Sequence, residues 1–359
     1  MNKSKDTFNK IKVLIVGSGI IGKSNAFKLS DYGFDITIVD QDEIHNSSNA
    51  ALGILMGKIY QKRKGRSWIL RQKSSELWPK WINILRSYNP NLKIEKPFYQ
   101  LTNDLKKFNK LTSFANNYQY DDLEIVEANS NILDPINEIF KGNKLQGIIS
   151  HQDGRINPKV LLETLNIALK SRNIKTINNQ IIKIKKIDKK WNLVLKTGEI
   201  LVGDIVILCN SLDSLKLINP EIYDIKLKPV LGQAIEIFHE KKNTNFLSLP
   251  KLLNINGKNL ITLSENKIII GSTDEYSLKP ENSYLNELFD FLEHKPDWLD
   301  KTNISRRWFG IRSRPEGEPS PLLKSLEKGL ILCSGFYKNG ILLAPACSHW
   351  VSEEIKKHI

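Results

Sequence analysis

A glycine-rich turn near the start of the chain constrains the fold more than any other feature. Residues 17–22, GSGIIG, fit the pattern G-x-G-x-x-G and directly follow the apolar run IKVLIV at 11–16. Gly17 permits a tight turn, Gly19 lets the backbone approach a pyrophosphate, and Gly22 lets a helix pack closely on a strand. Apolar strand, glycine turn and following helix together predict a dinucleotide-binding βαβ unit.

The residues after the turn complete this unit. Ile20 and Ile21 open the predicted helix, whose first N–H groups and positive dipole end face a bound phosphate. A second apolar strand is predicted over 35–40 and ends on Asp40, which lies 18 residues beyond Gly22. A carboxylate there accepts hydrogen bonds from the two hydroxyls of an adenosine ribose and disfavours the 2′-phosphate of NADP. Gln41, the next residue, is also expected to contact the cofactor. The unit by itself fits NAD as well as FAD.

The remaining sequence alternates helical and extended segments without a clean linker. An amphipathic helix is predicted from about 66 to 88, and a second helix follows Asn157 to about 172. The predicted extended runs are 181–187, 192–196, 199–209, several short strands over 226–273, and 329–335, before a final helix from about Ile341. This order predicts an α/β chain that passes between a Rossmann-like lobe and an antiparallel lobe.

Composition excludes several classes of protein. The 359 residues carry 53 Lys and Arg against 39 Asp and Glu, a net charge of +14, but the lysines are dispersed and no nucleic-acid recognition motif accompanies them. We therefore expect no nucleic-acid partner. Three cysteines without Cys-x-x-Cys spacing predict a reducing compartment and no disulfides. His151 and His294 lack metal-ligand spacing, so no metal is expected.

The same reasoning gives an expected location. The polar residues 1–10 lack the apolar run of a signal peptide, and no stretch approaches the roughly 18 apolar residues of a membrane span. We expect a cytoplasmic protein with no transmembrane segment. Whether it forms a homo-oligomer is left open.

Several segments resemble one protein family from end to end. Residues 335–345, GFYKNGILLAP, resemble the flavin-contact motif of glycine oxidase, G-H-[FY]-R-N-G-I-L-L-A-P. Residues 308–312, WFGIR, resemble its W-A-G-[IL]-R. Further similar segments, in the same order as in the family, lie at 46–55, 153–165, 228–233 and 268–273. On these motifs the chain is identified as a member of the glycine oxidase and D-amino-acid oxidase family of FAD-dependent oxidoreductases, closest to glycine oxidase.

The resemblance implies FAD as cofactor and a division into two discontinuous domains. Residues 1–92, 148–224 and 320–359 would form a Rossmann-like FAD-binding domain. Residues 93–147 and 225–319 would form a substrate-binding domain with an antiparallel sheet over the flavin. Besides the βαβ residues above, the residues expected to contact FAD are Asn46, Ser47, Ser48, Ala51, Gly53, Ile182, Asn210, Gly335, Lys338, Asn339, Gly340, Ile341 and Leu342.

The expected chemistry is hydride transfer from the α-carbon of an amino acid to flavin N5. The resemblance makes Arg312 the clamp for the substrate carboxylate, because a guanidinium matches a carboxylate bidentately; Arg314 is the reserve candidate. Lys338 is the second catalytic candidate: it stands where the family has Arg and keeps the positive charge without the bidentate fork. Phe336 stands where the family has His, and Leu231 where it has Arg. These departures leave the FAD site intact and put the substrate preference in question.

Two further expectations concern the same region. The N-terminus of the final helix, after Asn339, is expected to face flavin C2=O and to stabilise the reduced cofactor by its dipole; an ordinary N-cap by Asn is compatible with this role. Tyr223, Tyr276 and His239 are interpreted as structural rather than substrate-covering residues, and Cys209 as a small buried residue at the end of a strand.

Three functions remain open from the sequence. The first is an oxidase of a small amino acid or N-alkyl glycine (glycine, sarcosine or D-amino-acid type) that is reoxidised by O2 to H2O2, with thiamine biosynthesis as one possible setting. The second is a dehydrogenase of the same fold that passes electrons to a quinone. The third is a flavoprotein that has lost catalysis, which the residues at Phe336, Lys338 and Leu231 would explain.

Overall fold

The apolar runs at both ends of the chain meet in one parallel sheet. The computed structural model describes residues 10–41, 47–118, 122–240 and 245–358. Six strands lie side by side in the order β19-β20-β13-β1-β2-β9, and only the edge strand β19 runs antiparallel to its neighbour. Their bounds are β19 Leu322–Glu327, β20 Leu330–Ser334, β13 Ile205–Leu208, β1 Lys12–Val16, β2 Asp35–Asp40 and β9 Lys175–Asn178. This is the predicted Rossmann-like arrangement.

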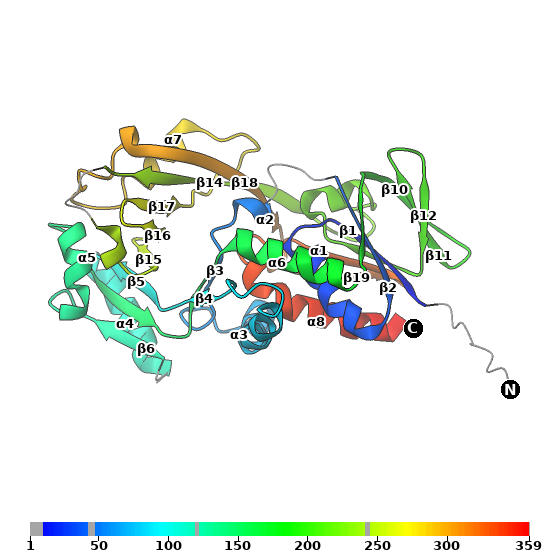
Figure 1. Ribbon diagram of the computed structural model, residues 1–359, viewed down its shortest axis with the longest axis horizontal. Coiled ribbons are helices and arrows are strands. Elements are labelled where there is room, and N and C mark those ends of the chain that lie inside the picture. Colours follow the sequence, from blue (N-terminus) through cyan, green and yellow to red (C-terminus); the bar gives the residue numbers. More distant parts are fainter. Residues whose placement is uncertain (1–9, 42–46, 119–121, 241–244, 359) are drawn as a thin grey trace.

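Alternation along β1 gives this sheet two buried faces. Val13 and Ile15 pack in one core with the helices α1 (Ile20–Leu29), α3 (Gly65–Leu85), α6 (Pro158–Ser171) and α8 (Gly340–His358). Leu14 and Val16 pack in another core with an antiparallel sheet of β10 (Ile181–Ile187), β11 (Lys190–Leu195) and β12 (Ile200–Gly203). Because successive side chains of a strand point to opposite faces, the central sheet is covered on both sides. We call this three-layered unit the parallel lobe; it lies on the right in Figure 1.

The second lobe is built on one large sheet. Its eight strands lie in the order β18-β14-β17-β16-β15-β5-β7-β6, and every neighbouring pair is antiparallel except β15 and β5. The bounds are β18 Ile304–Pro315, β14 Leu227–Phe238, β17 Lys267–Gly271, β16 Lys258–Ser264, β15 Leu252–Ile255, β5 Phe98–Thr102, β7 Gln146–Ser150 and β6 Leu123–Val126. The helices α4 (Leu105–Tyr118), α5 (Asp134–Ile139) and α7 (Asn282–Leu285) accompany this large-sheet lobe (Figure 1).

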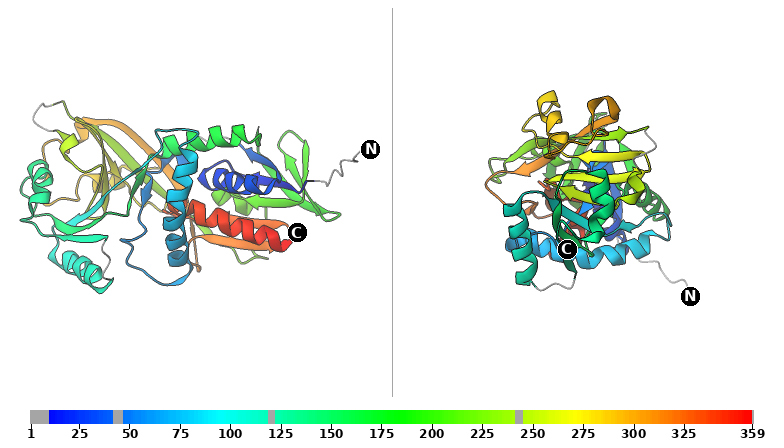
Figure 2. Two further views of the ribbon diagram at one scale, coloured as in Figure 1. Left: turned by 60° about the horizontal axis from the view of Figure 1, so that its bottom comes forward. Right: turned by 90° about the vertical axis from the view of Figure 1, so that its left-hand side faces the viewer.

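Short elements connect the lobes. The helix α2 (Ser47–Ala50) and the strand β3 (Ile54–Leu55) follow β2, and β3 pairs with β8 (Gly154–Ile156), which in turn pairs with β4 (Ile94–Glu95). The left view of Figure 2 shows α3 crossing the middle of the molecule beside α8. Trp308 of β18 donates from Nε1 to the carbonyl of Ala50 at 3.2 Å, so the end of α2 is held by the large sheet.

The structure confirms several local predictions and refines others. The helix predicted after Asn157 is present as α6, and the Asn157 side chain caps it by accepting from two of its backbone N–H groups. Gly33 adopts a left-handed φ of +74° and caps the short 3₁₀ turn that follows α1. The extended run 199–209 divides at Asp204 into β12 and β13, which belong to different sheets. Because β12 is half buried and β13 is fully buried, both have the pattern of an apolar strand. The sequence therefore does not reveal that the chain passes from one sheet to the other between them.

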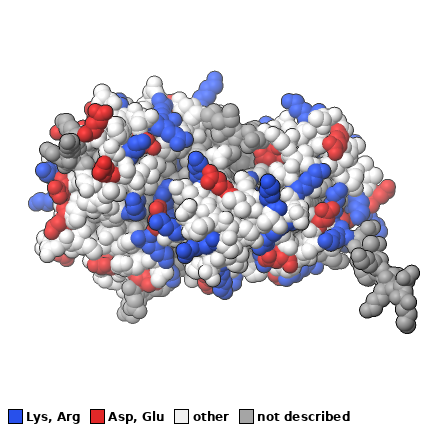
Figure 3. Space-filling model, viewed as in Figure 1, with Lys and Arg blue, Asp and Glu red and all other residues white. Residues whose placement is uncertain are grey.

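The charged residues are spread over both lobes. On the face shown in Figure 3, Lys and Arg side chains alternate with Asp and Glu and form no continuous basic surface. None of the helices in the described ranges combines the length and the apolar composition that a membrane span requires.

Candidate active site

One cleft runs from the carboxyl end of β2 to the end of the large sheet nearest the parallel lobe. Its larger cavity, of about 400 Å³, reaches Arg312, and an adjoining cavity of about 350 Å³ reaches Asp40. The two cavities share wall residues at the start of α1, on α2 and after β13: Gly19, Ser47, Ser48, Cys209 and Ser211. An elongated dinucleotide, with its pyrophosphate at the shared wall, matches this shape.

The glycine turn has the contacts that its sequence pattern requires. Gly17 has a φ of +103° and donates from its N–H to Val39 O at 2.8 Å. A Cβ on Gly22 would lie 1.8 Å from Gly17 O, so α1 can pack this closely on the turn only with glycine at position 22. Gly17 lines the cleft, whereas Gly22 supports it from behind.

The start of α1 is joined to α2 by one hydroxyl group. Ser48 Oγ accepts from Ile20 N at 2.9 Å and so caps a helix to which it does not belong. A Cβ on Gly19 would lie 2.9 Å from the same oxygen, so glycine at position 19 admits Ser48 as well as a ligand. Ile21, Ser47 and the neighbouring Ala51 and Gly53 also line the larger cavity.

At the other end of the cleft, Asp40 lies where an adenosine ribose is expected. Its Oδ2 accepts from Ser18 N, and Gln41 and Asn210 complete the wall. Ile181 also lines this end, whereas the neighbouring Ile182 is 53% exposed and lies outside the wall. Asn46 falls outside the described residues.

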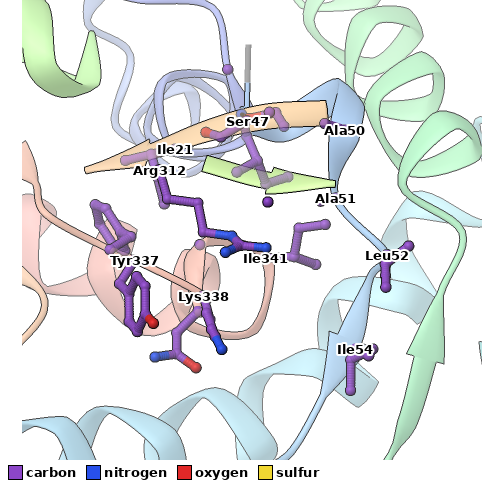
Figure 4. Close-up of a pocket in the computed structure, with 18 of the residues that line it drawn as sticks. Ile21, Ser47, Ala50, Ala51, Leu52, Ile54, Arg312, Tyr337, Lys338 and Ile341 are labelled. Carbon is purple, nitrogen blue, oxygen red and sulfur yellow. Dashed lines mark hydrogen bonds between the residues drawn. The ribbon is translucent and has the colours of Figure 1, made fainter. Parts of the chain in front are cut away.

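Arg312 extends into the larger cavity from β18, as Figure 4 shows. Nη1 donates to Thr273 O at 3.2 Å and to Asp274 Oδ1 at 2.9 Å, and Nη2 donates to Ser272 Oγ at 2.6 Å. The side chain is 14% exposed. Burial lowers the pKa of the Arg312 guanidinium, and the nearby Asp274 opposes this shift. The result is a desolvated cation held in a fixed orientation.

A glycine on the neighbouring strand provides space for this guanidinium. A Cβ on Gly232 would lie 2.0 Å from Arg312 Nη2 and 2.5 Å from Cζ. The strand β14 pairs with β18 through Gly232 and Gly310, two residues before Arg312. The reserve candidate Arg314 shares the face of Arg312 but lies outside the cavity wall, where Nη1 donates to Tyr276 OH at 2.6 Å.

Asp274 connects Arg312 to the turn before α8. Its second carboxylate oxygen accepts from Lys338 Nζ, and Tyr337 OH donates to Oδ1 at 3.3 Å. Burial and the carboxylate of Asp274 raise the pKa of Tyr337 to about 12. Lys338 therefore shares its counter-charge with Arg312, and Phe336 adds a buried apolar wall.

The N-terminal end of α8 forms one side of the same cavity. Asn339, Gly340 and Ile341 line it. Asn339 Oδ1 accepts from Arg71 Nη2 at 2.7 Å, a contact that the sequence did not suggest. Gly335 and Leu342 lie behind the wall: Gly335 N donates to Ser313 Oγ at 3.2 Å, and Leu342 O accepts from Trp78 at 2.9 Å.

Sequence reasoning missed several residues of this site. Tyr60, Arg71 and Ser272 line the larger cavity, and Asp274 orients its cations. One signal was present: Arg71 falls at the buried spacing of α3, three residues before Ser74 and seven before Trp78. An arginine on the apolar face of an amphipathic helix is a candidate for a functional contact.

The other singled-out residues lie elsewhere or have a structural role. Tyr223 OH donates to Glu327, Tyr276 is 60% exposed, and neither they nor His239 line the two cavities. Cys209 is half-buried directly after β13 and lines the cleft, where Asn25 donates to its Sγ at 3.3 Å. Over the ranges that the structure describes, no three His, Cys, Asp or Glu side chains gather as a metal site.

The residues of the cleft fit FAD. Gly19 lies at the wall shared by the two cavities, where any side chain would collide with Ser48 and narrow the passage for a pyrophosphate. The ribose end offers a carboxylate, and the far cavity is large enough for a flavin ring beside a small substrate.

Comparisons with known proteins agree with this site. Residues 12–354 match the family described as FAD dependent oxidoreductase (DAO). The chain is 25% identical to a glycine oxidase of Pseudomonas putida over 346 residues, 93% of this chain and 92% of that protein. It resembles the crystal structure of glycine oxidase from Geobacillus kaustophilus with a TM-score of 0.81 at 19% identity, covering 97% of this chain and 95% of that one.

A second structure was determined with the cofactor present. L-alpha-glycerophosphate oxidase from Mycoplasma pneumoniae with FAD bound gives a TM-score of 0.78 at 14% identity, covering 97% of this chain and 95% of that one. The match over nearly the whole length, together with the cleft described above, means that this chain is an FAD-dependent enzyme and belongs to the DAO family of FAD-dependent oxidoreductases.

Proposed function

We propose that the protein oxidises a small amino acid or N-alkyl glycine and is reoxidised by O2 with release of H2O2. One observation carries this proposal: a buried, oriented guanidinium, Arg312, projects into the end of an FAD-sized cleft. A guanidinium in this setting binds a carboxylate through two charge-assisted hydrogen bonds. The cavity of about 400 Å³ also has to hold the flavin ring, which leaves room for a small substrate only.

Arg312 and the residues around it each have a proposed role. Arg312 binds the substrate carboxylate, and Asp274 fixes the guanidinium by its hydrogen bond at 2.9 Å. Lys338 adds positive charge on the same side, and Phe336 excludes water from one wall. Tyr337 stays protonated at neutral pH and is therefore a hydrogen-bond donor to Asp274. FAD, when bound, supplies the hydride acceptor for the α-carbon of the substrate.

The cofactor contacts and the domain division are part of the same proposal. The FAD-binding residues are those named from the sequence that line the cleft, with Gly22, Gly335 and Leu342 supporting its walls. The substrate-binding domain comprises residues 93–147 and 225–319, which contribute the strands β5, β6 and β14 to β18. The strand β7, Gln146–Ser150, crosses the proposed boundary at 147.

A substrate panel tests the reaction. The purified protein, reconstituted with FAD under anaerobic conditions, is mixed with glycine, sarcosine or D-alanine, and loss of flavin absorbance is followed. Methylamine and glycinamide serve as controls without a carboxylate and are expected to leave the flavin oxidised. Bleaching by none of the three acids would contradict the proposed substrate class and favour a flavoprotein without this catalysis.

A second measurement tests the electron acceptor. With the substrate that bleaches the flavin fastest, peroxide formation in air is compared with reduction of a quinone dye under nitrogen. Peroxide in a one-to-one ratio to oxidised substrate is the expected result. Quinone turnover without peroxide would show a dehydrogenase of the same fold instead.

A further inference from the structure

Arg71 of α3 is a buried cation that forms no ion pair with a carboxylate of the described residues. The residue is 3% exposed, and Nη1 donates to Met56 O at 2.5 Å while Nη2 donates to Asn339 Oδ1 at 2.7 Å. Its guanidinium lies 3.7 Å from the centre of the Tyr60 ring. The buried Nε has no hydrogen-bond partner, and no described carboxylate lies within ion-pair distance of this side chain.

A buried positive charge that is compensated only by neutral hydrogen-bond acceptors and an aromatic ring requires an explanation. Burial lowers the pKa of Arg71, and the nearby Tyr60 and Asp153 only oppose the shift. Asp153 is already the acceptor for the backbone N–H groups of residues 57–59 and for a serine hydroxyl. Because an arginine side chain keeps its proton in proteins, the cavity wall carries a positive charge at this point.

This charge acts on the N-terminal end of α8 through Asn339. An Asn before a helix commonly caps it by accepting from the N–H groups of the first turn. Here the side-chain oxygen accepts from Arg71 instead, and the first backbone bond of the helix is Leu343 N to Asn339 O at 2.9 Å. Among the contacts of the described residues, the N–H groups of Gly340, Ile341 and Leu342 have no acceptor, and Gly340 and Ile341 line the cavity.

We propose that Arg71 is a positioning residue that makes this end of α8 a binding site for the negative charge of the reduced flavin at N1 and C2=O. The inference rests on the proposed placement of the flavin ring in the larger cavity. The guanidinium adds a full charge to the helix dipole, and by holding Asn339 it leaves the N–H groups of the first turn for the flavin oxygen.

A second carboxylate on the substrate is the alternative anion for this cation. The contacts favour the flavin. Both terminal nitrogens of Arg71 donate to neutral oxygens of the protein, at Met56 and Asn339. The second of these oxygens belongs to the residue that precedes α8, which directs the effect of Arg71 toward the helix end.

The test compares four proteins reconstituted with FAD: wild type, Arg71→Met, Arg71→Gln and Arg71→Lys. Sulfite adds to flavin N5 and leaves negative charge at N1 and C2=O, so its dissociation constant, followed by flavin absorbance, reports the stabilisation of that charge without any substrate. The reduction potential of the bound FAD is a second readout. Arg172→Met removes an arginine that packs on Phe27, away from the cavity, and serves as control.

We expect Arg71→Met and Arg71→Gln to weaken sulfite binding by about tenfold or more and to lower the potential, because a poorly screened charge is lost. Arg71→Gln keeps a buried donor for Asn339 and covers the case in which the Met variant does not fold. Arg71→Lys should restore most of the affinity, and Arg172→Met should match wild type.

Unchanged sulfite affinity and potential in both neutral variants would overturn the inference. So would an effect confined to the KM of a dicarboxylic amine such as iminodiacetate, which would place a substrate carboxylate at Arg71. Since sulfite needs no amine to react, absence of amine oxidation would contradict the proposed function while leaving this inference supported by the sulfite series.

Discussion

Replacing Gly232 with Ala should disable the carboxylate clamp without altering the clamp residue. The new Cβ would lie 2.0 Å from Arg312 Nη2, against the 3.4 Å of an ordinary contact, so the guanidinium must move by about 1.4 Å. A shift of this size breaks the hydrogen bond to Ser272 Oγ at 2.6 Å and turns the fork away from the substrate. Misplacement by about 1 Å can reduce a rate about a hundredfold. We therefore expect kcat/KM for the best amino-acid substrate to fall about a hundredfold while FAD stays bound.

A double-mutant cycle shows whether the effect passes through Arg312. Arg312→Met alone should lower kcat/KM by a similar or larger factor, since it removes both charge-assisted hydrogen bonds. Adding Gly232→Ala to Arg312→Met should then change kcat/KM by less than about threefold, because no guanidinium remains to be displaced. Equal hundredfold effects in both backgrounds would refute the argument. Flavin absorbance and urea unfolding of each variant would separate the clamp from a general overpacking effect of about 1–3 kcal/mol.

Three other substitutions test the surroundings of the cleft. Ser48→Ala removes the acceptor for Ile20 N and should weaken FAD binding to the apoprotein by roughly fivefold or more, as measured by fluorescence titration; unchanged affinity would show that the hydroxyl is dispensable. Asp153→Asn weakens the charge-assisted bonds from the amides of residues 57–59 and should lower the free energy of unfolding by about 2–4 kcal/mol in urea, whereas a loss below about 0.5 kcal/mol would contradict this role. Burial raises the pKa of Tyr337 to about 12 from 10.0, so the folded state resists its ionisation and stability should decline as the pH rises from about 10 toward 12; Tyr337→Phe should decline less steeply, and an identical decline would be inconsistent with the shift.

The sequence predicted the parts of the fold that local patterns determine. The turn at Gly17, the strand ending on Asp40 and the cap at Asn157 each combine a residue type with a fixed spacing, so few conformations compete. The family resemblance identified Arg312 as a candidate site residue, because its motif has a distinctive order of residues. In the structure Arg312 lines the larger cavity. The roles of these residues in binding remain predictions for the experiments above.

The contacts that were missed join segments far apart in the chain. Asp274 reaches both Arg312 and Lys338, and Arg71 reaches Asn339 across 268 residues. No spacing rule connects such positions, since they meet only after both lobes are assembled. Ile182 shows that a local pattern can also mislead. It lies in an apolar run without clean alternation, where a shift of one residue decides which side chain lines the cleft and which faces solvent.

The positive charges around the cavity would favour the neutral form of the substrate amine, which the proposed chemistry requires. Among the described residues that line the larger cavity there is no histidine and no carboxylate to act as a base, whereas Arg71, Arg312 and Lys338 all lie on its wall. Asp274, just outside, is shared by two of these cations. Nearby positive charges disfavour a substrate ammonium, and the carboxylate bound at Arg312 only partly offsets them. The wall that is proposed to bind the acid would thus also favour loss of the proton from the amine, and the proposed hydride transfer from the α-carbon requires that deprotonated form.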